Sequence, residues 1–194
     1  MKKRLTIAVL LLTITTVGGG LLMLNRDESQ VLSENLFNDE QTGITFSYQG
    51  LGLREGDGSE DDSETVRTIA QFGTVNDDEP PVLITIRQES RFRIVSNIAG
   101  KPTLDIVRDN LLSNYPDRFS EFELVSSDEI QVDNLPAIEI IFSYVNDNQE
   151  LQQKFIAVKK NDDEIVYLTF QSFADNFAQL QEQKFRPIVE SIDI

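Results

Sequence analysis

The stretch that decides the fold covers residues 135–171 and reads LPAIEIIFSYVNDNQELQQKFIAVKKNDDEIVYLTFQ. Polar clusters at 146–148 and 161–163 divide it into segments rich in β-branched and aromatic residues. Such segments are typical of strands, and short Asn/Asp turns join neighbouring antiparallel strands. The stretch therefore predicts an antiparallel meander, with strands at 135–145, 149–160 and 164–171.

Apolar residues occupy both alternating rows of these strands. In the third strand Ile165 and Tyr167 fall on one face, whereas Val166, Leu168 and Phe170 fall on the other. A sheet with one face in water would show apolar residues on one row alone, so we expect helices to cover both faces.

Two segments have the pattern of covering helices. Leu104, Val107 and Leu111 form one apolar stripe and predict a helix from Thr103 to about Asn114.

A second helix is predicted from about Asp175 to Val189, and Pro187 should kink or split it. The chain end at 191–194 is expected to dock on the domain through its apolar residues, Ile192 and Ile194.

Further strands are predicted upstream of the meander, at 43–48, 51–54, 66–72, 82–88 and 122–130. The expected fold class is α+β, with an antiparallel β-sheet sandwiched between helices in an α-β-α arrangement.

The N-terminal segment has the pattern of a membrane anchor. Leu5–Leu24 carries no charge and follows the basic residues Lys2, Lys3 and Arg4. As a helix it would span roughly 30 Å, the thickness of a bilayer core. Basic residues before the span favour a cytoplasmic N-terminus and an extracytoplasmic domain. The alternative is a secretory signal cleaved near Gly20, which would release the domain.

The chain is thus divided into a cytoplasmic basic end (1–4), a single N-terminal transmembrane signal anchor (5–24), a linker (25–41) and an extracytoplasmic domain (42–194). The formal net charge is −16, and the basic residues of the first 26 positions leave −20 on the rest. So acidic a domain is a poor partner for nucleic acid, because neutralising phosphates requires clustered Lys and Arg.

The composition excludes several chemistries. The chain has no Cys and no His. It therefore lacks the residues for disulfides, thiolate zinc sites, cysteine nucleophiles and imidazole bases.

The segment 55–64, EGDGSEDDSE, is strongly acidic. One interpretation is a solvated loop between strands. The other is a weak divalent-cation site with Asp57, Glu60, Asp61 and Asp62 as ligands, although the glycine required at the sixth position of an EF-hand loop is missing. No other cofactor is expected.

Arg87, Arg91 and Arg93 form a basic cluster in the acidic domain. They could clamp an anion or a partner carboxylate, or they could neutralise neighbouring Asp and Glu residues.

Three motifs, GITFSYQG (43–50), FIAVKKNDDEIVYLTFQ (155–171) and DNFAQLQEQKFRPIVESIDI (175–194), resemble the PsbP-like family. This family comprises extrinsic photosystem II subunits, their bacterial relatives and, by fold, a nuclear-import factor that acts on the GTPase Ran. The resemblance implies an antiparallel sheet sandwiched by helices over about residues 42–194. It carries no functional residue over, because the metal-binding histidines of some members have no counterpart here. A membrane-anchored bacterial member of unassigned role is the best match.

These observations favour a non-enzymatic, membrane-tethered, extracytoplasmic binding or scaffold module acting on an envelope or membrane-complex protein. The alternative is a cation- or small-ligand-binding module that uses the 55–64 loop. A carboxylate-based hydrolase is disfavoured, because no nucleophile and base occur in a recognisable motif.

Overall fold

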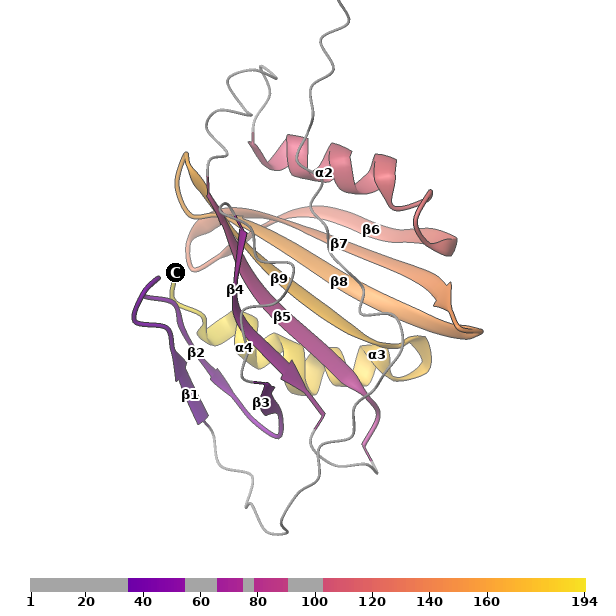
Figure 1. The fold of residues 1–194 in the computed structure, drawn as a ribbon, viewed down its shortest axis with the longest axis horizontal. Helices are drawn as coiled ribbons and strands as arrows, with labels where there is room; N and C mark the ends of the chain where they lie inside the picture. The colour runs from indigo at the N-terminus through magenta and orange to yellow at the C-terminus, as the bar shows by residue number, and fades with distance from the viewer. Residues whose placement is uncertain (1–34, 55–65, 75–78, 91–102) are drawn as a thin grey trace, which may run out of the picture.

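The predicted meander forms three neighbouring strands of a seven-stranded antiparallel sheet. The computed structural model describes residues 35–54, 66–74, 79–90 and 103–194. Strand order in the sheet is β3-β4-β5-β9-β8-β7-β6 (Figure 1). The strands are β3 (Gly52–Arg54), β4 (Val66–Gly73), β5 (Val82–Ser90), β6 (Ser120–Val132), β7 (Leu135–Asn146), β8 (Gln149–Lys159) and β9 (Glu164–Phe173).

Two tight turns set the register of the meander. Asp133 and Asn134 have φ values of 50° and 59°, and Asp147 and Asn148 have 49° and 62°. Two successive positive φ values define the type I′ hairpin turn, which Asn and Asp tolerate better than most residues. The Asn/Asp turn predicted at 146–148 is therefore confirmed, and Asp133 and Asn134 form a turn of the same kind between β6 and β7.

Helices cover both faces of the sheet, as the sequence predicted (Figure 1). Helix α2 (Thr103–Asn114) buries Val107 and Leu111 against β7 and β8. On the opposite face lie α3 (Ala174–Leu180), the π-helical turn η1 (Gln181–Phe185) and α4 (Arg186–Ser191). We call these two sides the α2 face and the α3–α4 face.

The predicted split of the last helix occurs just before Pro187. Pro187 is the second residue of α4, and η1 directly precedes that helix. Proline has no N–H to donate to the carbonyl four residues earlier, and a π-turn is one way to accommodate such a break.

A small hairpin packs at the margin of the sheet. β1 (Asn35–Asn38) pairs with β2 (Thr45–Tyr48), and the Phe37 ring stacks on Phe46 with centroids 4.8 Å apart. The predicted linker, residues 25–41, therefore overlaps the folded part of the chain, which begins before residue 42.

Asp39 fastens this hairpin to the sheet. Its carboxylate accepts hydrogen bonds from Arg67 Nη1 and Nη2, both at 3.1 Å, and from Thr42 Oγ1 at 2.6 Å. Burial opposes its ionisation, but the bonds from Thr42 and Arg67 and the charge of Arg67 outweigh burial and lower the Asp39 pKa.

The predicted docking of residues 191–194 is confirmed. Asp193 pairs with Thr45 through two backbone hydrogen bonds, and Ile192 is buried. The chain end marked in Figure 1 accordingly lies beside the β1–β2 hairpin.

Within the described ranges, no helix is both long and apolar enough to cross a membrane. The predicted anchor at 5–24 and the alternative cleavage near Gly20 lie outside those ranges and stay predictions.

Candidate functional site

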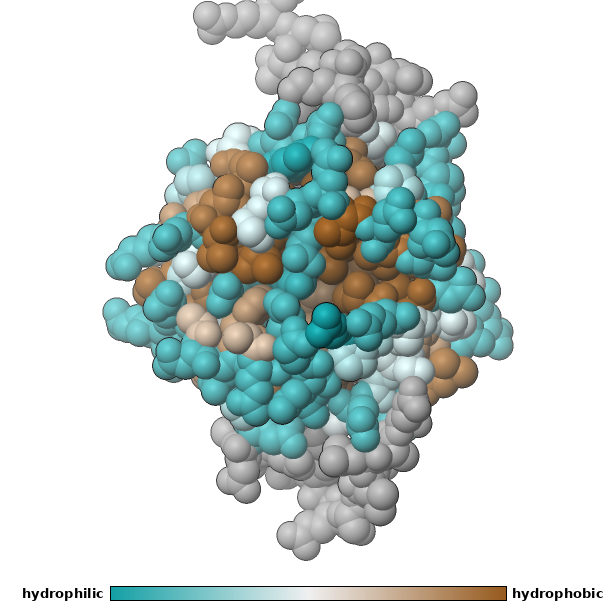
Figure 2. All heavy atoms as spheres, turned by 180° about the vertical axis from the view of Figure 1, so that it is seen from behind, coloured by the Kyte–Doolittle hydropathy of each residue, from teal (hydrophilic) through white to brown (hydrophobic). Residues whose placement is uncertain are grey.

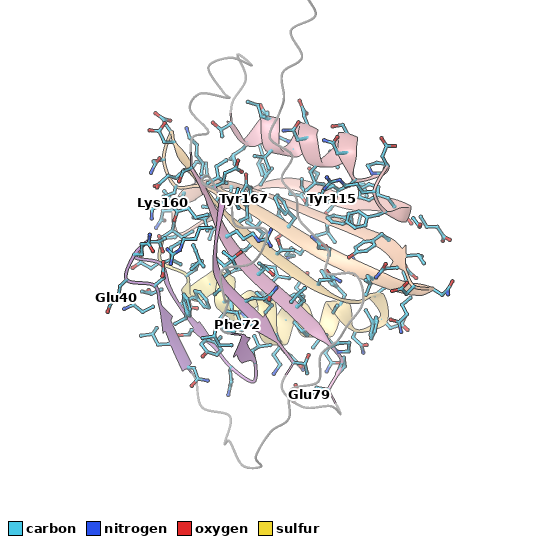
Figure 3. The ribbon with its side chains drawn as sticks, viewed as in Figure 1. Glu40, Phe72, Glu79, Tyr115, Lys160 and Tyr167 are labelled. Carbon is cyan, nitrogen blue, oxygen red and sulfur yellow. The ribbon has the colours of Figure 1, made fainter. Side chains whose placement is uncertain are left out.

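The α2 face contains a group of buried polar side chains. We call it the polar cluster and define it as Glu89, Tyr115, Tyr144, Gln153 and Tyr167. Tyr115 follows α2, and the other members come from strands β5, β7, β8 and β9. Figure 3 shows Tyr115 and Tyr167 between the sheet and α2.

Glu89 is the most unusual titratable group of the polar cluster. It is 8% exposed, and the Tyr167 hydroxyl donates a 2.8 Å hydrogen bond to its Oε2. Burial raises the pKa of Glu89 from 4.5 to about 7, although the bond from Tyr167 favours the ionised form. A carboxyl that titrates near neutral pH is therefore enclosed beside a tyrosine.

Other polar atoms of the cluster have no hydrogen-bond partner. Gln153 is 1% exposed, and within the described ranges neither its Oε1 nor its Nε2 has a hydrogen-bond partner. The hydroxyls of Tyr115 and Tyr144 are likewise buried without a partner. Leaving such a group unsatisfied costs roughly 1–3 kcal/mol, so these side chains weaken the α2 face unless water satisfies them.

Burial also keeps these tyrosines neutral. It raises the pKa of Tyr144 to about 12 and raises that of Tyr115 well above its ordinary value. Each hydroxyl therefore remains a donor across the physiological pH range.

The lysines of the meander and its turns are engaged elsewhere. Lys154 Nζ lies 2.9 Å from Glu139 Oε2, Lys159 Nζ lies 2.8 Å from Asp162 Oδ1, and Lys160 Nζ donates to the Thr42 carbonyl. None of these contacts joins a lysine to a serine hydroxyl, which a Ser-Lys nucleophile would require.

The predicted site residues are only partly within the described ranges. Asp57, Glu60, Asp61 and Asp62 lie outside them, so a cation site in the 55–64 loop stays a prediction. Among the described residues, no three acidic side chains gather as metal ligands.

The predicted arginine cluster is placed in part. Arg87 is half-buried on β5, opposite Tyr167 of β9 in the strand register. Arg91 and Arg93 lie outside the described ranges, so their role as a clamp stays a prediction.

Exposed large apolar residues mark the margins of the two sheets. They are Leu36 on β1, Leu53 on β3, and Leu124 and Val125 on β6. Figure 2 shows the reverse side of the molecule, where apolar surface is exposed among hydrophilic side chains. Exposed apolar surface that is rimmed by polar residues is typical of protein-binding sites.

Two solved structures have a similar arrangement of elements. Cyanobacterial PsbP (CyanoP) from Synechocystis sp. PCC 6803 gives a TM-score of 0.56 at 13% identity, covering 89% of this chain and 98% of that one. The Ran-binding protein Mog1p of Saccharomyces cerevisiae gives 0.50 at 10% identity, covering 84% and 96%. The chain has the PsbP/Mog1-like fold.

At these identities the likeness shows the PsbP/Mog1-like fold alone. No protein-family model matches the sequence, and no curated protein matches it either. The expected family resemblance is therefore supported at the level of fold.

Sequence reasoning missed the polar cluster and the exposed pair on β6, although each left a signal. Gln153 interrupts the inward row Leu151, Phe155, Ala157 of β8, and Leu124 and Val125 are adjacent apolar residues in a strand that is otherwise mostly polar.

Proposed function

We propose that the chain is a non-enzymatic binding or scaffold module, held at a membrane by residues 5–24, whose extracytoplasmic domain acts on a protein partner. The observation that carries this proposal is the placement of exposed apolar side chains. They lie on strands at the margins of the sheets, whereas Glu89, the described carboxyl with the most perturbed pKa, is buried beside Tyr167. Apolar side chains at an exposed margin can contact a partner protein, whereas a carboxyl enclosed in the core is poorly placed to act on a substrate.

The fold supports the same proposal. Of the two similar structures, one is a Ran-binding protein and the other is a cyanobacterial PsbP. The PsbP/Mog1-like fold therefore serves protein recognition in at least one other protein. Neither partner is proposed for this chain, because a fold can host many functions.

The membrane tether rests on the sequence. Leu5–Leu24 is uncharged and long enough to span a bilayer, and the basic residues precede it. Intact mass of the protein from bacterial membranes tests this part. Retention of residues 1–24 and resistance to alkaline extraction are expected, whereas a mass that begins near residue 20 would show a cleaved signal.

Crosslinking of the full-length chain in its own cells tests the binding role. The expected result is at least one protein recovered reproducibly with the wild-type chain and absent when an unrelated anchored domain replaces residues 35–194. Recovery of abundant proteins alone, with both chains, would contradict a scaffold role.

A further inference from the structure

We infer that the open edge of β6 binds an extended, basic segment of a partner protein by adding a strand to the sheet. This inference rests on the proposed binding function and names the surface that performs it. A sheet edge offers unpaired backbone N–H and C=O groups, and a peptide that adds a strand satisfies them.

The backbone of β6 is available along one side. β6 is the last strand in the sheet order and pairs with β7, and no strand of the described ranges pairs with its other side. The register between β6 and β7 shifts before Ser126 and is regular from Ser126 to Val132. This regular part would pair with about seven residues of a partner, or roughly 23 Å of extended chain. The opposite sheet edge, β3, has three residues and offers far less.

Exposed apolar side chains lie next to the regular part of β6. Leu124 and Val125 are 43% and 54% exposed, whereas most large apolar residues of the described ranges are buried or half-buried. Both residues precede Ser126 directly. An added strand would therefore cover apolar surface as well as satisfy backbone groups, and the two effects together give a stable contact.

Charge decides which occupant fits. The acidic residues of β6 are Glu121, Glu123, Asp128 and Glu129, all of them exposed, and the strand contains no Lys or Arg. Arg108 on α2 approaches Glu129 at 3.5 Å, but Glu129 remains 79% exposed. Asp128 lies in the regular part of β6, and a lysine or arginine that faces it from an added strand would make a favourable charge contact.

A second copy of the chain fits poorly for the same reason. Antiparallel pairing of Ser126–Val132 with its own copy would place Glu129 opposite Glu129. Like charges directly opposite each other destabilise a strand pair. Exposed acidic residues thus block self-pairing and leave a basic strand as the favoured occupant.

The test uses the full-length chain in detergent and a fluorescent peptide of alternating lysine and valine, about nine residues long to span the regular part of β6. Fluorescence anisotropy should detect binding to the wild type. Asp128→Lys should weaken this binding by about tenfold or more, because it places like charges together. Glu40→Lys, an exposed acid in the β1–β2 turn, makes the same charge change away from β6 and should leave binding within about twofold. Melting curves establish that both variants are folded.

A peptide of alternating lysine and proline separates strand pairing from simple charge attraction. It has the same charge but cannot donate backbone hydrogen bonds from its prolines. Weak binding of this peptide, and slower amide hydrogen exchange in β6 with the lysine–valine peptide, are expected. Equal binding of both peptides, or binding unaffected by Asp128→Lys, would overturn the inference. A wild-type dimer that Asp128→Lys abolishes would overturn it in favour of a second copy.

Crosslinking with the Asp128→Lys chain distinguishes the inference from the proposed function. Loss of the partner recovered by the wild type supports both. A partner that the variant retains leaves the proposed function standing and contradicts the role of β6, whereas the absence of any reproducible wild-type partner contradicts the proposed function itself.

Discussion

The two faces of the seven-stranded sheet bury their polar groups differently. On the α3–α4 face the buried Lys154 is paired with Glu139, and the buried Ser172 hydroxyl donates to the Phe173 carbonyl, although Gln88 Oε1 is buried there without a partner among the described residues. On the α2 face more buried atoms lack a partner within the described ranges, namely both amide atoms of Gln153 and the hydroxyls of Tyr115 and Tyr144. Because unsatisfied polar groups cost stability, the α3–α4 face should contribute more to the free energy of unfolding than the α2 face.

The largest effect should come from the α3–α4 face. Phe185 is 1% exposed and stacks on Phe170, with ring centroids 4.9 Å apart. Phe185→Ala should lower the free energy of unfolding by about 3–5 kcal/mol at every pH, as measured by urea denaturation. Gln179→Ala, an exposed position on α3, is the control and should change little. A loss below about 1 kcal/mol for Phe185→Ala would contradict the assignment of stability to this face.

Glu89 should make the stability of the α2 face depend on pH. Its pKa rises from 4.5 to about 7 on folding, so the folded protein holds the proton more tightly than the unfolded chain. Stability should therefore be highest below pH 4.5 and fall as pH rises from 4.5 to 7.

Glu89→Gln should remove this dependence and stabilise the protein above pH 7 by as much as about 3 kcal/mol, with no gain at pH 4. Glu123→Gln, an exposed acid on β6, is the control. If the free energies of unfolding of the wild type and of Glu89→Gln instead changed in parallel from pH 4 to 8, Glu89 would be ionised in the folded protein over that range.

Gln153→Met should stabilise the α2 face by about 1–2 kcal/mol, because it removes two unpartnered polar atoms at nearly constant volume. The same change at exposed Gln183 should have little effect on the unfolding midpoint. If Gln153→Met instead destabilises the protein, the amide is hydrogen-bonded in solution, and the two faces differ less than their contacts suggest.

The smallest effect concerns the hairpin at the margin of the α3–α4 face. Asp39→Asn should lower stability by roughly 1 kcal/mol at pH 7, because an amide accepts weaker hydrogen bonds from Arg67 than a carboxylate does. The pKa of Asp39 is lowered below 3.8, so the wild type should lose this advantage as the pH falls further. Thermal melts at pH 7 and about pH 2 test both points, and a gap that persists at the lower pH would rule out the ion pair as its cause.

The sheet and its two helical layers could be predicted because their signals are local. The Asn/Asp turns between β6 and β7 and between β7 and β8 adopt the positive φ values that those residues tolerate. The double rows of apolar residues in β9 predicted coverage of both faces, and the two cores confirm it.

The rest depends on contacts between distant residues. β1 has four residues, and its pairing with β2 and its stacking on the sheet are not encoded in a local period. In the sequence Glu89 has the pattern of an outward polar residue after the row Val82, Ile84, Ile86, but β9 lies beside β5 and places Tyr167 against the Glu89 carboxylate. The edge position of β6 is likewise a property of strand order, which the sequence of a single strand does not determine.

The backbone pairing of Asp193 with Thr45 has a consequence for biosynthesis. The β1–β2 hairpin is made early, yet its packing is complete only when residues 192–194 have been synthesised. Contacts so far apart in sequence slow folding, because a long loop must close first. A ribosome-bound chain that stops short of residue 192 would therefore carry a hairpin whose packing is incomplete, and its domain would still be easy to unfold.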